Sequence, residues 1–275
     1  MPTPRQSFTV ALTCISRVLI LRDRILGWAG AGRRGHTPGL SASTHSISSG
    51  SSVLDAVFVE PAQAPARAAV LLCHGIGETA DHWFPVQRLL AANGVASLLF
   101  DFSGYGKSTG SVDWSQFEKD AVSAFQCMQR LAPALPLSIL GFSLGSGIAA
   151  AIVNRVPASR LVLCAAFTSF RDAARSAGLP ASLSFLVPRI WCAEESLRGC
   201  ELPVLIVHGE KDRLFPVQMA RDLAALCGPN AELLVVPEMA HNQPFRRPHL
   251  SYWGPIISHL VSEQYAGHST AALSL

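Results

Sequence analysis

The sequence predicts an α/β fold in which a mainly parallel β-sheet is covered by helices on both faces. Strand-like and helix-like segments alternate along the chain from about residue 70, which is the order that parallel sheets require. Several strand-like segments are continuous apolar runs, as expected for strands buried on both faces. The chain has 275 residues and 49% hydrophobic residues, which is enough for the core of one large domain.

Seven segments have the composition of strands. The first alternates apolar and polar residues and is broken by Pro61 and Pro65, whereas most of the others are apolar throughout. In order they are LDAVFVE (54–60), AAVLLCHG (68–75), which ends in a glycine-rich turn, VASLLFDF (95–102), PLSILGF (136–142), RLVLCAAF (160–167), PVLIVHGEKD (203–212), which has an acidic exit, and AELLVVPEMAH (231–241).

Five segments between or after these strands have helical periodicity. Glycine or proline residues follow several of them and favour termination there. The expected helices cover about residues 82–92, 114–131, 146–156, 216–227 and 250–264.

The ends of the chain differ from this pattern. Residues 1–52 form an apolar and basic extension, of which Ala29 to Ser52 has the Gly/Ser/His/Thr-rich composition of a linker. Charged residues interrupt the apolar part too often for a membrane span, so we expect a loosely attached helix. Membrane contact through residues 1–30 is the alternative. The folded domain is therefore expected at 53–265, followed by a tail at 266–275.

Charge and cysteine content exclude several classes of function. A net charge of +3, without a stripe of basic residues, does not fit a nucleic-acid-binding protein. The seven cysteines are scattered, mostly within apolar runs, and are expected to be reduced core thiols. Cys192 and Cys200 could pair in an oxidising compartment. No CxxC or HExxH spacing predicts a metal site, and GYGKS lacks the spacing of a phosphate-binding loop.

The motif most informative about chemistry is Gly141-Phe142-Ser143-Leu144-Gly145. It fits G-x-S-x-G and lies between an expected buried strand and a helix rich in small residues, the context of a nucleophilic serine on a sharp turn. Gly141 and Gly145 would provide room for that turn. The alternative is a chance match in a glycine-rich strand–helix connection.

Two further strand ends carry groups that would activate a serine. Asp212 follows the strand PVLIVHG, and His241 follows the strand AELLVV and its exit PEMA. Both lie at carboxyl ends of strands, and in a parallel sheet these meet at the same edge as Ser143. A serine hydroxyl needs a base to remove its proton, and a histidine oriented by a carboxylate supplies one.

These motifs resemble those of the α/β-hydrolase superfamily over residues 53–262. The resembling segments are His74-Gly75, Gly104 to Ser108, Gly141 to Gly145, His208 to Asp212 and Ala240 to Asn242. They are similar to serine aminopeptidase-like (S33-type) hydrolases and to compact α/β-hydrolase-domain thioesterases. The resemblance implies an eight-stranded, mostly parallel sheet with a short cap segment.

The resemblance also implies roles for individual residues. It assigns Ser143 as the nucleophile, His241 as the base and Asp212 as the acid that orients the base. The backbone N–H groups of Leu144, which follows the nucleophile, and of Ile76 would form the oxyanion hole. It implies no cofactor and no metal.

Several other polar residues are interpreted as structural. His74 and His208 precede glycines at strand ends, where they can brace loops by hydrogen bonding. His249 and His259, on the last expected helix, are assigned to the surface or to packing. Asp172 is the rival to Asp212.

Three more polar side chains lie in loops near the expected site. Asp101 is expected to fasten its loop to Ser108. Glu78 and Tyr105 could approach a substrate, but loop capping explains them equally well. The apolar stretch ASLSFLVPRIW (181–191) could line an acyl pocket or pack on the sheet.

The function expected from this combination is a serine hydrolase of an ester or thioester, and less so of an amide, because no charged pocket for a peptide terminus is evident. The partner is then a small-molecule or acyl-chain substrate, and the expected location is the cytoplasm. The alternatives are a catalytically silent binding module of the same fold, and a lipid hydrolase associated with a membrane through its N-terminal segment. No sequence feature indicates an oligomeric state.

Overall fold

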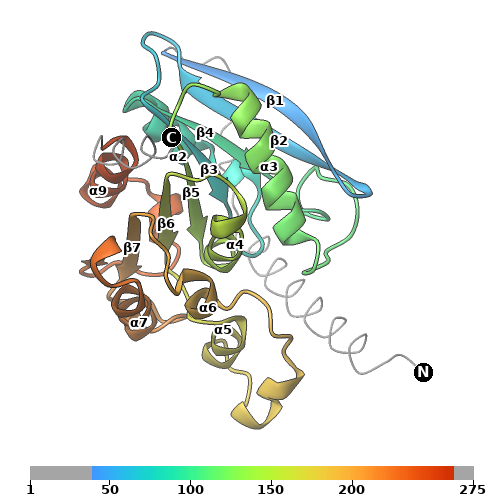
Figure 1. Cartoon of the computed structure of the whole chain (residues 1–275), viewed down its shortest axis with the longest axis vertical. Helices are drawn as coiled ribbons and strands as arrows, with labels where there is room; N and C mark the ends of the chain where they lie inside the picture. Colours follow the sequence, from blue (N-terminus) through green and yellow to red (C-terminus); the bar gives the residue numbers. More distant parts are fainter. Residues whose placement is uncertain (1–38, 263–275) are drawn as a thin grey trace, which may run out of the picture.

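The computed structural model describes residues 39–262, which are built around one eight-stranded sheet (Figure 1). The strand order is β1-β2-β4-β3-β5-β6-β7-β8. The strands are β1 (Leu40–Ser49), β2 (Ser52–Pro61), β3 (Ala68–Cys73), β4 (Val95–Phe100), β5 (Leu137–Phe142), β6 (Arg160–Cys164), β7 (Val204–Gly209) and β8 (Ala231–Val236). Only the β1–β2 and β2–β4 pairs are antiparallel. The predicted mostly parallel sheet is confirmed.

Strand β1 corrects the expected linker. It lies within residues 29–52, and it pairs with β2 along its whole length, from Leu40 opposite Pro61 to Ser49 opposite Ser52. Ile47 is buried in the core, and the Ser49 hydroxyl donates a 2.7 Å hydrogen bond to Asp120. The sheet therefore begins at Leu40, and the predicted start of the folded domain at residue 53 is wrong. The predicted helix and membrane contact in the apolar extension, and the predicted tail, lie outside the described residues and stay predictions.

Helices cover both faces of the sheet. They are α2 (Ala80–Ala92), α3 (Phe117–Leu131), α4 (Leu144–Ile152), α5 (Phe170–Ser176), α6 (Ala193–Leu197), α7 (Val217–Cys227), α8 (Gln243–Arg246) and α9 (Leu250–Val261). Short 3₁₀ helices are η1 (Val153–Arg155), η2 (Ala181–Leu186) and η3 (Gly228–Asn230). The α3 helix begins three residues after the expected Trp114. Asp113 explains the delay, because its carboxylate accepts hydrogen bonds from the backbone and side chain of Ser115 and stabilises a turn there.

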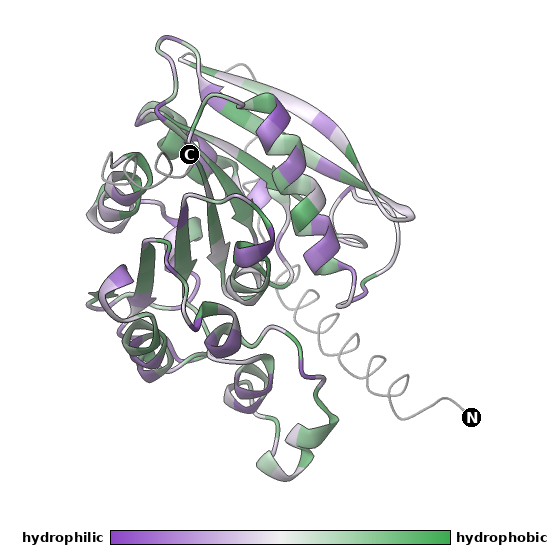
Figure 2. Ribbon diagram, viewed as in Figure 1, coloured by the Kyte–Doolittle hydropathy of each residue, from purple (hydrophilic) through white to green (hydrophobic). Residues whose placement is uncertain are grey.

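The core has two layers, one on each face of the sheet. Buried residues of α2, α8 and α9 pack on one face, and those of α3, α4, α6 and α7 pack on the other. Apolar residues run through the central strands, whereas the helices carry polar residues on their outer sides (Figure 2). This double coverage explains why the central strands are continuous apolar runs.

The segment between β6 and β7 forms the expected short cap and extends away from the sheet (Figure 1). Its apolar stretch divides into two parts. Leu183, Phe185 and Leu186 of η2 are exposed, with Phe185 68% exposed. Val187 and Trp191 are buried, and Trp191 packs against the aromatic rings of α3 and α5. The second half of the stretch is therefore packed into the domain, but the ring contacts of Trp191 are to helices and not to the sheet.

Within residues 39–262, no helix combines the length and the apolar character needed to cross a membrane.

Candidate active site

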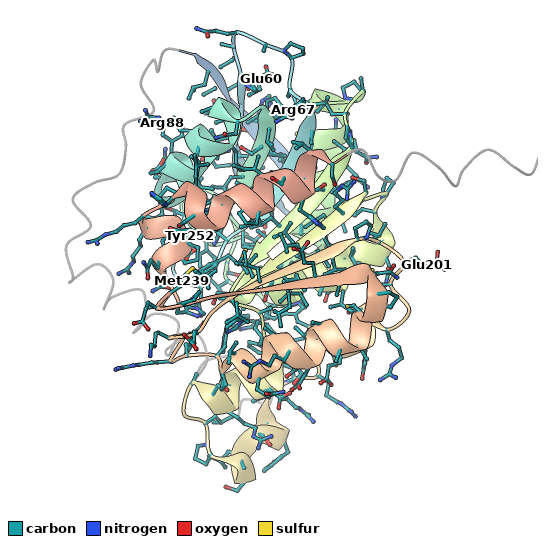
Figure 3. The ribbon with its side chains drawn as sticks, turned by 90° about the vertical axis from the view of Figure 1, so that its left-hand side faces the viewer. Glu60, Arg67, Arg88, Glu201, Met239 and Tyr252 are labelled. Atoms are coloured by element: carbon teal, nitrogen blue, oxygen red, sulfur yellow. The ribbon has the colours of Figure 1, made fainter. Side chains whose placement is uncertain are left out.

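Three strand ends bring the expected reactive side chains to one edge of the sheet. Ser143 follows β5, Asp212 follows β7 by three residues, and His241 follows β8 by five. Figure 3 shows the direction of the last two strands, since Glu201, before β7, and Met239, after β8, lie at opposite ends of the pair. Because β5, β7 and β8 run parallel, their carboxyl ends share the edge at Met239.

Ser143 occupies a strained turn between β5 and α4. Its φ of 52° and ψ of −118° lie in a region that side chains rarely adopt. The turn is held by a 3.0 Å hydrogen bond from the Ser143 N–H to the carbonyl oxygen of Cys164. An ideal Cβ on Gly141 would lie 2.3 Å from the carbonyl oxygen of Gly145. The glycine at 141 is therefore required by space, as the motif predicted.

The structure brings Ser143, His241 and Asp212 into one hydrogen-bonded chain. His241 Nε2 lies 2.9 Å from Ser143 Oγ, and His241 Nδ1 lies 2.7 Å from Asp212 Oδ2. The other carboxylate oxygen of Asp212 accepts hydrogen bonds from the backbone N–H groups of Leu214 and Phe215, at 2.8 and 2.9 Å. Both oxygens of Asp212 are thus fixed, which sets the orientation of the imidazole.

The charge state of Asp212 fixes the tautomer of His241. Burial raises the pKa of the Asp212 carboxyl, but the hydrogen bond and charge of His241 and the two backbone N–H groups outweigh burial and lower the pKa overall. The ionised carboxylate can only accept hydrogen bonds. His241 Nδ1 must therefore donate to Asp212, which leaves Nε2 free to accept the hydroxyl proton of Ser143.

The two predicted oxyanion donors lie in segments that touch each other. Leu144 is the first residue of α4, where backbone N–H groups have no partner within the helix. Ile76 lies in the turn after β3. An ideal Cβ on Gly145 would lie 2.0 Å from the carbonyl oxygen of Cys73 and 2.7 Å from that of His74. The start of α4 therefore packs directly on the loop that leads to Ile76.

His74 and His208 make the loop contacts expected of structural residues. His74 Nδ1 lies 2.8 Å from the Gly75 carbonyl oxygen, and its Nε2 accepts from the Phe102 N–H at 3.5 Å. His208 Nε2 lies 3.0 Å from the Phe215 carbonyl oxygen. Burial lowers the pKa of both imidazoles. Both rings are therefore neutral near pH 7. His74 joins the loop after β3 to the loop after β4, and His208 ties β7 to the loop after it.

The remaining polar candidates take part in other contacts. The Asp172 carboxylate accepts hydrogen bonds from the hydroxyls of Thr168 and Ser169, at 2.9 and 2.6 Å, so it is Asp212 that contacts the imidazole. Asp101 is bonded to its loop as expected, because its carbonyl oxygen accepts a 2.5 Å bond from Ser108. Its carboxylate also accepts from the Ala80 N–H.

Glu78 caps its own loop. One carboxylate oxygen accepts from the Gly75 N–H at 2.8 Å and from the indole N–H of Trp83 at 2.7 Å. Tyr105 is buried next to the His74 ring, 5.5 Å between ring centroids. The capping interpretation therefore accounts for Glu78.

The last two histidines lie at the two ends of α9. His249 is the residue that caps the start of α9, with its Nδ1 accepting from the Ser251 N–H, and His259 is largely buried near the other end of that helix. Their assignment to surface and packing agrees with these positions.

Sequence reasoning missed two features around His241. The rings of Phe142 and Phe215 pack on the imidazole, with centroids 5.4 and 5.2 Å away. A cavity of about 1120 Å³ also adjoins His241, and basic residues contribute much of its lining. The basic lining of this cavity was not expected from the sequence. In the sequence, the two phenylalanines were marked only by their short distance along the chain from Ser143 and Asp212.

Among residues 39–262, no cluster of three or more histidine, cysteine, aspartate or glutamate side chains could hold a metal ion. The described hydrogen-bonded chain can perform proton transfer with side chains alone: a hydroxyl, an acceptor imidazole nitrogen and a fixed carboxylate.

The chain is similar to hydrolases of known family. The family model described as "Serine aminopeptidase, S33" matches residues 64–190, a range that contains Ser143 but neither Asp212 nor His241. Lysophosphatidylserine lipase ABHD12 of Macaca fascicularis is 27% identical over 195 residues, covering 64% of this chain and 49% of that protein. The Danio rerio protein of the same name is 29% identical over 200 residues, covering 65% and 52%. The chain thus spans about half the length of the curated relatives it matches.

Solved structures with a similar fold include esterase Pf2001 and the protein Est1E. Esterase Pf2001 of Pyrococcus furiosus aligns with a TM-score of 0.65 and 20% identity, covering 82% of this chain and 95% of that one. Est1E of Butyrivibrio proteoclasticus, solved with ferulic acid bound, aligns with a TM-score of 0.64 and 19% identity, covering 78% and 96%. At this level of identity the likeness concerns the fold.

Proposed function

Because this chain belongs to the α/β-hydrolase superfamily, we propose that it is a serine hydrolase that cleaves an ester or thioester bond through an acyl-enzyme intermediate. The single observation that carries the proposal is the continuous hydrogen-bonded chain from Ser143 Oγ through His241 to Asp212, at 2.9 and 2.7 Å. Relatives named as lipases and esterases support an ester as the substrate class.

The first half of the reaction transfers the acyl group to the enzyme. Ser143 Oγ attacks the carbonyl carbon while His241 Nε2 takes the hydroxyl proton. Asp212 stabilises the resulting imidazolium and keeps its orientation. The oxyanion is bound by the N–H groups of Leu144 and Ile76. His241 then gives the proton to the leaving alcohol or thiol, and the acyl carbon remains bonded to Ser143.

The second half of the reaction releases the acid. Water enters the place of the leaving group and attacks the acyl carbon, and His241 Nε2 takes one of its protons. The bond from the acyl carbon to Ser143 Oγ breaks, and the serine oxygen recovers the proton from His241. The carboxylic acid leaves, and the starting state is restored without a cofactor.

Esters and thioesters are preferred over peptides on electrostatic grounds. An aminopeptidase must hold the ammonium group of a free N-terminus, which requires a negative environment. The cavity that adjoins His241 is instead lined by several cations, and like charges repel each other there.

A serine-to-alanine variant tests the mechanism. Ser143→Ala should lower kcat for p-nitrophenyl butyrate by about 10⁴-fold or more and abolish labelling by a fluorophosphonate probe. Ser41→Ala, on the exposed outer strand β1, is the matched control and should label at the rate of the unchanged protein. Turnover retained in Ser143→Ala would refute the mechanism. Folded protein that neither labels nor hydrolyses would favour the catalytically silent binding module.

A further inference from the structure

The basic cavity beside His241 takes no part in the proton transfers or in the binding of the oxyanion. It is built from the loops that leave β7 and β8, and from α8. Besides His241, the residues that line it include the charged side chains of Lys211, Arg213, Glu238, Arg246 and Arg247, whereas His241 must be neutral to act as the base. Four cations therefore face one anion.

The cation charge is only partly compensated within the cavity. Lys211 Nζ lies 3.5 Å from Glu238 Oε1, which offsets one positive charge. Arg213 and Arg247 are exposed and have no acidic partner among residues 39–262. Arginine presents a planar set of N–H donors that matches phosphate and carboxylate groups. The cavity thus offers an anion two uncommitted guanidinium groups.

The positions of these cations are fixed by the same loops that hold the reactive groups. Lys211 and Arg213 flank Asp212 in the chain, and the Lys211 N–H donates a 3.0 Å hydrogen bond to the Met239 carbonyl oxygen, which joins the two loops. Figure 3 labels Met239 at this edge of the molecule. The cavity is therefore anchored to the loop that carries the acid.

The other two arginines are the last residue of α8 and the residue after it, and this short helix is firmly packed. The Trp253 indole N–H donates a 2.8 Å hydrogen bond to the Pro244 carbonyl oxygen, and the Tyr252 hydroxyl donates to the Arg247 carbonyl oxygen. Phe245 stacks on Trp83, 5.5 Å between ring centroids. The backbone that presents Arg246 and Arg247 is thus held from α9 and α2, and binding an anion there requires little ordering of the backbone.

The cavity lies on the side of the site that faces the leaving group of the substrate. His241 lines it, whereas Ser143, Leu144 and Ile76 do not. In the proposed reaction His241 must reach the leaving group in order to give it a proton, whereas the acyl carbonyl lies at Ser143 and the oxyanion donors. A cavity on the histidine side of the site therefore receives the leaving group.

We propose that this cavity binds an anionic leaving group, so that the preferred substrates are esters or thioesters whose alcohol or thiol part carries a phosphate or carboxylate. The inference rests on the proposed hydrolase function. In the reaction the bond between the acyl carbon and the leaving oxygen or sulfur breaks, and the proton from His241 goes to that atom. The anionic group keeps its charge and leaves with the alcohol or thiol.

A matched pair of water-soluble substrates tests the proposal. 1-Butyrylglycerol 3-phosphate and 1-butyrylglycerol share the acyl chain and the scissile bond, and they differ only in the phosphate group that the leaving alcohol carries. We expect kcat/KM to be at least about 10-fold higher for the phosphate ester at low salt. One charge-assisted hydrogen bond to the phosphate is enough to raise kcat/KM by about that factor. The preference should decrease as added salt screens the exposed cations.

Variants locate the preference in the cavity. Arg213→Gln/Arg247→Gln should lower the ratio of the two kcat/KM values about tenfold or more. Arg130→Gln, which removes an exposed arginine at the far end of α3, should leave the ratio at the level of the unchanged protein. If the double variant does not fold, the salt dependence of the ratio in the unchanged protein decides the matter, and a ratio independent of salt contradicts the proposal.

Different results would overturn the anionic leaving group and the hydrolase function. Equal kcat/KM for the two esters, in protein that hydrolyses both, would overturn the anionic leaving group and leave the serine hydrolase intact. Protein that hydrolyses neither ester and does not label with a fluorophosphonate would overturn the hydrolase function, and with it the role of the cavity.

Discussion

Gly145 packs so closely on Cys73 that an ideal Cβ at position 145 would lie 2.0 Å from the Cys73 carbonyl oxygen. This contact joins the turn that carries Ser143 to the end of β3, where the expected oxyanion loop begins. The obstacle is backbone, which cannot rotate away as a flexible side chain can. The packing of helix α4 on the end of strand β3 therefore requires a residue without a side chain at this position.

Gly145→Ala should consequently disturb both folding and reactivity. We expect a loss of about 1–3 kcal/mol in the free energy of unfolding from overpacking, and slower fluorophosphonate labelling because the turn must shift. Gly254→Ala is the matched control, since no atom lies within 4 Å of its ideal Cβ and it sits inside helix α9. That variant should gain about 0.5–1 kcal/mol. Chemical denaturation of both variants checks this, and equal effects would contradict the packing argument.

Asp212 and Asp172 give a second test, because both were candidates for the acid. Asp212→Asn should lower kcat by about 10³- to 10⁴-fold, because an amide that donates to His241 Nδ1 favours the wrong tautomer. Asp172→Asn should change kcat less than about 10-fold, since its carboxylate is hydrogen-bonded to the hydroxyls of Thr168 and Ser169 and to the guanidinium of Arg175, and not to His241. Steady-state kinetics on p-nitrophenyl butyrate distinguish them. A larger loss in the Asp172 variant would reverse the assignment.

Mutation should change the stability little in the exposed half of the apolar cap stretch and strongly in the buried half. Phe185→Ser should change the free energy of unfolding by no more than about 0.5 kcal/mol, because the ring is 68% exposed. Trp191→Ala should cost about 3–5 kcal/mol, because its indole is 2% exposed and packs on Phe117 and Phe170. Thermal and urea unfolding measure both. A large cost for Phe185→Ser would mean that the exposed ring has a partner.

The central sheet could be predicted from the sequence because burial on both faces leaves continuous apolar runs. The meeting of Ser143, Asp212 and His241 followed from the same reasoning, since the carboxyl ends of parallel strands share an edge. β1 was missed because LSASTHSISS has few apolar residues. It is an edge strand with a partner on one side only, and small hydroxyl side chains suffice there.

The basic cavity was missed for a different reason. Its arginines come from the loop after β7, next to Asp212, and from the end of α8, five or six residues after His241, and no periodicity connects them. Only the packing of the β7 and β8 loops on each other, through the hydrogen bond from Lys211 to Met239, brings them together. A contact between side chains on irregular loops leaves no pattern in a single sequence.

His259 should make stability depend on pH in the acidic range. Burial, followed by the positive charge of Arg160, lowers the pKa of the His259 imidazole to about 4 from the ordinary 6.5. Between these values the unfolded chain holds more protons than the folded protein, so the free energy of unfolding must fall as the pH falls. Because the ring is partly exposed, solvent screening reduces the effect to about 1–2 kcal/mol.

His259→Gln should therefore lose less stability between pH 7 and pH 4.5 than the unchanged protein. His74 and His208 act in the same direction, so part of the slope should remain. Denaturant titrations at several pH values measure the slopes, and identical slopes for the variant and the unchanged protein would show that His259 is protonated as easily in the folded state as in the unfolded chain.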